Sequence, residues 1–345
     1  GNSLVSKLGD EIIDIDWEVK ATSDSAKKLQ SEIQKNLNKL FDKQKIYFNY
    51  EGDKEKLQHE IRNLKIDLLI SQLNLDKYKY SEKSATLGSL FELTAKEMTA
   101  ETERKIKIAG FNKTNRELQI LKNKFDKPLQ FFNWKLDFPE VMNEQLTNRI
   151  GFDIVIGNPP YGANIDDLIE YFETNFPKTT KGYKDIYKIF YNQGLEKLTK
   201  QQGILTYITP NTFLLQPRYK DLRQFFLDSK IISILNLGEN VFDEVTVPTA
   251  IIFVKNENNS ATLRFADISK GSKYSGTISS IEFIEISQSI FKETPSNIFT
   301  DSIRLKVENE EQLVNILDFK DAGINYQRVK VGLSEKGISD LSKRL

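Results

Sequence analysis

Hydrophobic residues recur at intervals of three and four through residues 24–127, the spacing that places them along one face of an α-helix. The residues at these positions are Leu29, Ile33, Leu37, Leu40, Leu57, Ile61, Leu64, Leu68, Leu118, Leu121 and Phe125. Residues 50–53 separate the first two stripes and have the composition of a turn, another helical pattern begins near Leu87, and Pro128 ends the last one. The pattern predicts an antiparallel, coiled-coil-like helical arm.

From residue 150 onwards, short apolar runs alternate with longer amphipathic segments. Strands are expected at 152–157, 203–209, 231–236 and 248–254, and helices at 184–199 and 217–229. Such alternation is typical of a doubly wound parallel sheet, so the expected fold class is α/β. Shorter runs at 262–265 and 281–286 indicate peripheral strands, and residues 1–23 indicate a strand or a packed extended segment.

The composition narrows the chemistry that is open to the chain. Its 345 residues are 39% hydrophobic and 28% charged, which suits a globular protein of two or three domains. The absence of cysteine excludes disulfides, thiolate nucleophiles and cysteine-bound zinc, and the one histidine, His59, lies in a polar helical stretch. A net charge of zero argues against a complete DNA-binding protein, since phosphate contacts require a basic excess. No apolar run approaches the ~20 residues of a membrane span, and we expect a cytoplasmic protein that contacts no membrane.

The most informative local feature is the apolar run 152–157 followed by Asn158-Pro-Pro-Tyr161. Ligands of open α/β sheets bind at the carboxyl ends of the strands, where this tetrapeptide falls. Its residues suit methyl transfer to a planar amino group, whose nitrogen is a poor nucleophile because its lone pair is delocalised. The Asn158 side chain and the Pro159 carbonyl can accept the two amino hydrogens and so favour a pyramidal nitrogen. Two prolines keep that carbonyl rigid, and Tyr161 offers an aromatic face for stacking.

Residues 134–255 resemble the gamma-class DNA adenine-N6 methyltransferases, with a TaqI-like catalytic domain, and in particular the fused type IIG restriction–modification enzymes. The similar segments are 134–141, 151–161, 183–190, 203–213 and 241–253. The resemblance implies S-adenosylmethionine as the cofactor and double-stranded DNA as the partner. It also implies a target adenine turned out of the duplex, because an amino group inside the duplex is out of reach of the methyl donor.

The same resemblance suggests roles for individual residues. Asn158 and Pro159 would hold the amino group, Tyr161 would stack on one face of the base, and Phe242 would pack on its other face or at its edge. Phe190 would line the S-adenosylmethionine pocket, to which Asn158 is also adjacent. Core packing is an equal alternative for Phe190, because its expected helix also carries other large apolar residues.

The sequence departs from the family in lacking a glycine-rich turn for the cofactor, since no Gly-x-Gly pair lies near a strand end. The first four residues, Gly-Asn-Ser-Leu, resemble a segment that follows the cofactor half in the family. We therefore expect an internal fragment that is inactive alone. Its expected parts are a lead-in (1–23), the helical insertion (24–127), the catalytic half (128–256), and peripheral strands leading toward a target-recognition domain (257–345).

A partial Rossmann-like methyltransferase sheet has a physical consequence. The strand 152–157 would be an apolar edge, which folded proteins normally cover. We expect residues 1–23, the helical arm or a second copy of the chain to cover it, the last by self-association.

Two other functions fit the same residues. An enzyme with this tetrapeptide could methylate an amino group of RNA or of a protein glutamine. Alternatively, the chain could be a non-catalytic DNA-binding or scaffold subunit. The pattern also leaves open whether the arm is a spacer or clamps DNA or another partner.

Overall fold

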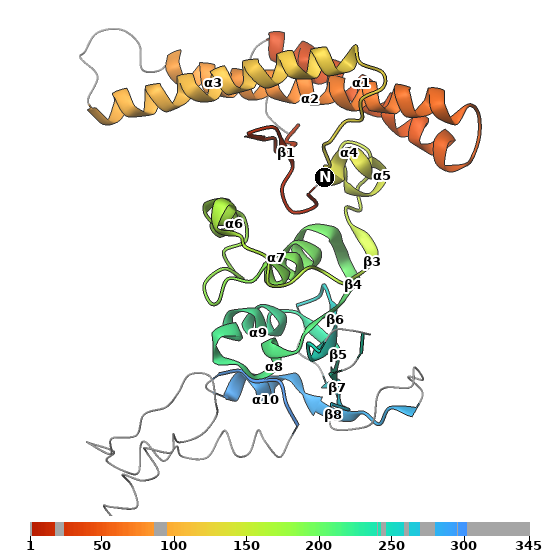
Figure 1. The fold of residues 1–345 in the computed structure, drawn as a ribbon, viewed down its shortest axis with the longest axis vertical. Coiled ribbons are helices and arrows are strands. Elements are labelled where there is room, and N and C mark those ends of the chain that lie inside the picture. Colours follow the sequence, from red (N-terminus) through yellow and green to blue (C-terminus); the bar gives the residue numbers. More distant parts are fainter. Residues whose placement is uncertain are drawn as a thin grey trace, which may run out of the picture.

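The structure, a computed structural model, describes residues 2–17, 24–85, 95–239, 241–242, 246–258, 262–269, 280–294 and 296–301. Figure 1 shows a long helical arm lying across one end of an α/β unit. Residues 302–345, the end of the predicted segment 257–345, lie outside the described residues, and so does the start of the helical pattern near Leu87.

Three long helices form the arm: α1 (Asp24–Phe48), α2 (Lys54–Ala85) and α3 (Ala95–Lys122). The predicted turn between the first two is confirmed, with Tyr50 and Gly52 at φ of 59° and 77°. Most of the predicted apolar stripe is buried or half-buried between the helices. Phe125 is the exception, because α3 ends before it and the residue is 63% exposed.

The lead-in segment packs under the arm rather than under the sheet. It forms a two-stranded hairpin of β1 (Lys7–Leu8) and β2 (Glu11–Ile12), and then buries Ile13, Ile15 and Trp17 in the core of the arm. Two short helices, α4 (Trp134–Asp137) and α5 (Pro139–Met142), then lead from the arm into the sheet. The predicted packed extended segment is confirmed in the described part of 1–23.

The α/β unit is built on six strands in the order β3-β4-β6-β5-β7-β8. Their bounds are β3 Phe152–Gly157, β4 Thr199–Pro210, β5 Lys230–Gly238, β6 Thr249–Lys255, β7 Thr262–Asp267 and β8 Ile284–Ser287. All the predicted strands are present, but the sheet is mixed rather than parallel, since β6 runs antiparallel to β4 and β5. Only ten residues join β5 to β6 (239–248), fewer than a parallel crossover requires.

The helices of this unit cover one face of the sheet (Figure 1). They are η1 (Asp166–Leu168), α6 (Ile169–Asn175), α7 (Ile186–Asn192), η2 (Gln193–Leu198), α8 (Thr212–Leu215), η3 (Pro217–Tyr219), α9 (Lys220–Leu227) and α10 (Gln288–Glu293). The predicted helix 184–199 is α7 continued by the π-helical η2. The main core lies between these helices and the sheet, and its centre includes Tyr191, Phe213, Phe226 and Ile252.

Strand β3 is an edge strand that pairs only with β4 among the described residues. Ile154 and Ile156 are 64% and 78% exposed, on the opposite face to Val155, which packs on the main core. The expectation that residues 1–23 or the arm cover this edge is therefore wrong. The lead-in buries its apolar side chains in the arm core and beside α6 and α7 instead.

An uncovered apolar edge predicts self-association of the isolated chain. We expect Ile156→Lys to shift the chain toward monomer in sedimentation velocity, because a charge on an edge strand opposes pairing. The free energy of unfolding should change by less than about 0.5 kcal/mol, since the side chain is already exposed. Ile106→Lys is the matched control, at an isoleucine that is 66% exposed on α3. Equal effects of the two substitutions would exclude the edge as the contact.

Candidate functional site

Four of the five predicted site residues follow strands whose carboxyl ends lie at one edge of the sheet, and the fifth, Phe190, lies on α7. Strands β3 and β4 are parallel, and β5 runs in the same direction because both β4 and β5 are antiparallel to β6. The carboxyl ends of β3, β4 and β5 therefore open onto the same edge. Asn158 follows β3 there, and Phe242 follows β5.

The Asn-Pro-Pro-Tyr loop, residues 158–161, begins directly after Gly157. A Cβ at Gly157 would lie 3.2 Å from the Tyr207 ring of β4, so a small residue lets the strand end sit tightly against its neighbour. Asn158 is exposed and Pro159 is buried. Tyr161 is half-buried and packs against the main core. The loop thus presents an amide to solvent from a fixed backbone.

Asp185, a residue that the sequence did not single out, fixes the far end of this loop. Its carboxylate accepts a hydrogen bond of 3.2 Å from the backbone N–H of Gly162 and is 9% exposed. Gly162 has a φ of 70°, a left-handed conformation that favours glycine. Asp185 directly precedes α7, inside the segment 183–190 that suggested a family motif, and that position is the only sequence signal for its role.

A buried ion pair holds the segment that carries Asp185. Lys188 on α7 is fully buried, and its Nζ donates to the Asp221 carboxylate and to the Tyr183 carbonyl, both at 2.7 Å. Asp221 also accepts from the Gly182 N–H at 2.9 Å. Burial lowers the pKa of Lys188 below its ordinary value, and the hydrogen bond that Lys188 donates to Asp221 opposes that shift.

The two other predicted aromatics are placed differently. Phe190 on α7 is half-buried and packs against both the main core and the cluster around Leu4 and Phe172, so it has a clear packing role. Phe242 is 37% exposed. Two strands separate β3 from β5, so three interstrand steps of about 4.8 Å lie between their ends. Asn158, Pro159 and Tyr161 lie in one loop, whereas Phe242 follows a strand that is three interstrand steps away from β3.

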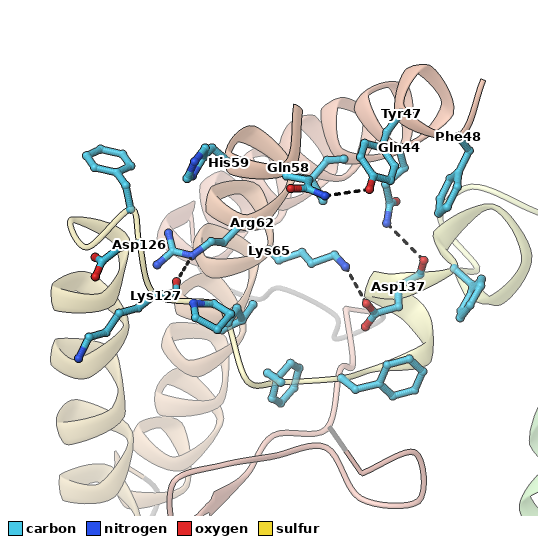
Figure 2. Close-up of a pocket in the computed structure, with 17 residues that line it drawn as sticks. Gln44, Tyr47, Phe48, Gln58, His59, Arg62, Lys65, Asp126, Lys127 and Asp137 are labelled. Atoms are coloured by element: carbon cyan, nitrogen blue, oxygen red, sulfur yellow. Dashed lines mark hydrogen bonds and ion pairs between the residues drawn. The ribbon is translucent and has the colours of Figure 1, made fainter. Parts of the chain in front are cut away.

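A cavity of about 580 Å³ lies elsewhere, at the joint between the arm and α4, and Figure 2 shows its lining. Three of its charged side chains have partners within the joint: Lys65 contacts Asp137 at 2.6 Å, and Arg62 donates to the carbonyls of Leu121, Lys124 and Lys127. None of the predicted site residues lines it. These contacts fasten the end of α3 to α2 and α2 to α4, which indicates a structural joint.

The described residues near the candidate site include no glycine-rich turn of the kind that holds S-adenosylmethionine. Asn158 follows β3 and Phe190 lies on α7, and none of the described glycines forms a phosphate- or nucleoside-binding turn beside either residue. The described part of the chain also contains no cluster of metal-ligating side chains. None of its described helices combines the length and hydrophobicity that a membrane crossing requires.

Comparison with known proteins identifies relatives over most of this region. The family model described as Eco57I restriction-modification methylase matches residues 18–242, more than half of the chain. The type II methyltransferase M.AccI of Acinetobacter calcoaceticus is 27% identical over 173 residues, 48% of this chain and 31% of that protein. The type II restriction enzyme and methyltransferase RM.Eco57I of Escherichia coli is 28% identical over 234 residues, 62% of this chain and 22% of that protein. The chain thus spans less than a third of either relative.

Among solved structures, the type IIG restriction endonuclease BpuSI is similar to 40% of this chain and 19% of its own chain. The two are 16% identical there, with a TM-score of 0.32.

Proposed function

Because the chain belongs to the Eco57I restriction-modification methylase family, we propose that it is part of a site-specific DNA adenine-N6 methyltransferase of the gamma class. The methyl group would come from S-adenosylmethionine and pass to an adenine turned out of the duplex. The observation that carries the proposal is the Asn-Pro-Pro-Tyr loop, which presents an exposed amide beside a buried proline at the carboxyl end of β3.

Each residue of the loop has a chemical task on this proposal. The Asn158 side-chain oxygen and the Pro159 carbonyl accept the two hydrogens of the adenine amino group. These two hydrogen bonds favour a pyramidal nitrogen, whose lone pair is then free to attack. Tyr161 stacks on the base, and Phe242 closes on it from the loop after β5. Asp185 keeps the loop in place through Gly162.

The rest of the methyl-donor pocket would belong to other segments of a longer protein. Phe190 and Asn158 would form one wall of that pocket, and S-adenosylmethionine supplies the methyl group when bound. The exposed edge of β3 is where a further strand can pair, since its backbone groups there have no partner among the described residues. We therefore expect the isolated chain to be inactive.

Labelled methyl transfer tests the proposal. The longer protein is incubated with S-adenosylmethionine carrying a labelled methyl group and, in separate reactions, with duplex DNA, RNA or protein. We expect label in duplex DNA alone, recovered as N6-methyladenine after digestion to nucleosides, and none with the 345-residue chain by itself. DNA methylated beforehand at the same sites is the control and should accept no label. Label recovered in RNA, in protein glutamine or on cytosine would contradict the proposal.

A further inference from the structure

An exposed tyrosine and an exposed arginine are locked together beside the Asn-Pro-Pro-Tyr loop. The Arg218 guanidinium lies 4.2 Å from the centre of the Tyr183 ring, which is 45% exposed. The Tyr183 N–H donates to the Arg218 carbonyl at 3.1 Å, so the backbones are joined as well. At Gly182 a Cβ would come within 2.6 Å of that carbonyl, so only glycine permits this approach. The arginine is therefore held in one orientation, which lowers the entropy cost of binding an anion.

Two lysines extend this surface, and we call Lys181, Tyr183, Lys184 and Arg218 the ridge. All four side chains are exposed. Lys184 pairs with Glu173 at 2.8 Å, whereas no carboxylate pairs with Lys181 or Arg218 in the part of the chain that the structure describes.

The acidic groups beneath the ridge are already neutralised or occupied. Asp221 is paired with the buried Lys188 and accepts from the Gly182 N–H. Asp185 is 9% exposed and accepts from Gly162. The charge that solvent meets on the ridge is therefore positive, although the net charge of the whole chain is zero.

The ridge is fixed to the candidate site through a short path. Asp185 holds Gly162, the residue that follows Tyr161, and lies one residue after Lys184. The segment that carries Lys181, Tyr183 and Lys184 is thus joined to the Asn-Pro-Pro-Tyr loop through Asp185. Lysine, arginine and the tyrosine hydroxyl are groups that contact phosphate oxygens in protein–DNA complexes.

We infer that the ridge binds the phosphate backbone of duplex DNA beside the target base. This inference rests on the proposed function and adds to it the surface that orients the duplex. Phosphate contacts fix register but read no sequence, so the ridge contributes affinity and not recognition of the site.

The experiment measures binding of a fluorescein-labelled duplex of random sequence to the 345-residue chain by fluorescence anisotropy. We expect Lys181→Gln/Arg218→Gln to weaken binding roughly tenfold at about 50 mM salt, and the slope of log K against log salt to fall by about two. Arg264→Gln/Lys292→Gln is the matched control. It also removes one arginine, which lies over the Phe283 ring, and one lysine, and both side chains are exposed on β7 and α10.

Each outcome decides the inference separately from the proposed function. A loss confined to the ridge variant, with unchanged circular dichroism and urea midpoint, supports it. Equal affinities and slopes for the ridge and control variants would overturn it, while DNA methylation by the longer protein could still be found. An absence of DNA binding by the unsubstituted chain would also overturn the inference. The proposed function would then be tested by the labelled-methyl experiment only.

Discussion

Asn158→Ala in the longer protein is expected to lower the rate of methyl transfer by about two to three orders of magnitude. That is the typical loss when one preorganised hydrogen-bonding group is removed from a reacting centre. Asn158 is exposed and no described side chain bonds to its amide, so the substitution removes no contact of the fold. Its effect should therefore fall on turnover under saturating DNA and S-adenosylmethionine, and not on stability. Single-turnover kinetics measure the rate of methyl transfer, and calorimetry measures cofactor affinity separately.

Asn164→Ala provides the control for this prediction. Asn164 is another exposed asparagine of the same connection, and its side chain only accepts a hydrogen bond from the Asp166 N–H. We expect turnover of this variant to stay within about threefold of the unsubstituted protein, because the loss of such a surface turn contact costs little. Equal turnover for Asn158→Ala and the unsubstituted protein would show that the Asn158 amide has no role in methyl transfer.

The strands and the arm could be predicted because their signals are local. The run 152–157 is apolar and bounded by Gly151 and the prolines, and the structure has β3 at those residues. The arm follows from spacing alone, since helix periodicity is independent of what the helix packs against. Strand direction is not encoded in this way. A central strand such as β6 has one buried face and one largely half-buried face whether it runs parallel or antiparallel, so only the length of its connection gave a signal.

Part of the candidate site could be proposed from the sequence for the same reason. Asn158, Pro159 and Tyr161 are adjacent in sequence, and any strand–loop geometry keeps them together. Asp185 and the Lys188–Asp221 pair depend on contacts across 23 and 33 positions, which no local pattern reveals. The uncovered edge of β3 was expected to be covered because folded chains normally cover such edges. What remained unforeseen is that the lead-in has its own apolar partners in the arm and beside α6.

Asp221→Ala is expected to destabilise the chain by about 3–5 kcal/mol, the largest loss of stability that we predict. The substitution leaves the charge of Lys188 buried without its carboxylate, and unpaired buried charges carry a penalty of that size. Urea unfolding at pH 7 measures the loss. Asp167→Ala, at an exposed aspartate of η1, is the control and should change stability by less than about 0.5 kcal/mol.

The pH dependence distinguishes a buried charge from a simple loss of packing. The folded-state pKa of Lys188 is already below its ordinary value of 10.5, and removing Asp221 lowers it further. Above the folded-state pKa of Lys188 and below 10.5, the unfolded chain binds more protons than the folded chain, so stability rises with pH. This rise begins at a lower pH in the Asp221→Ala variant than in the unsubstituted chain, because the folded-state pKa of Lys188 is lower in the variant. The penalty of Asp221→Ala should therefore shrink between pH 7 and pH 9. A penalty that is the same at both pH values would contradict this explanation.

Replacing both Lys188 and Asp221 separates the effect of the ion pair on stability from its effect on the position of the segment 182–185. Lys188→Met/Asp221→Leu should recover most of the stability, because apolar residues of similar volume can replace a buried ion pair. It should not restore the segment 182–185, since the bonds to the Tyr183 carbonyl and the Gly182 N–H are lost with the pair. Because Asp185 in this segment holds Gly162, we expect faster hydrogen exchange at the Gly162 amide in a chain of near-normal stability. Unchanged exchange there would mean that the ion pair stabilises the fold without positioning the loop.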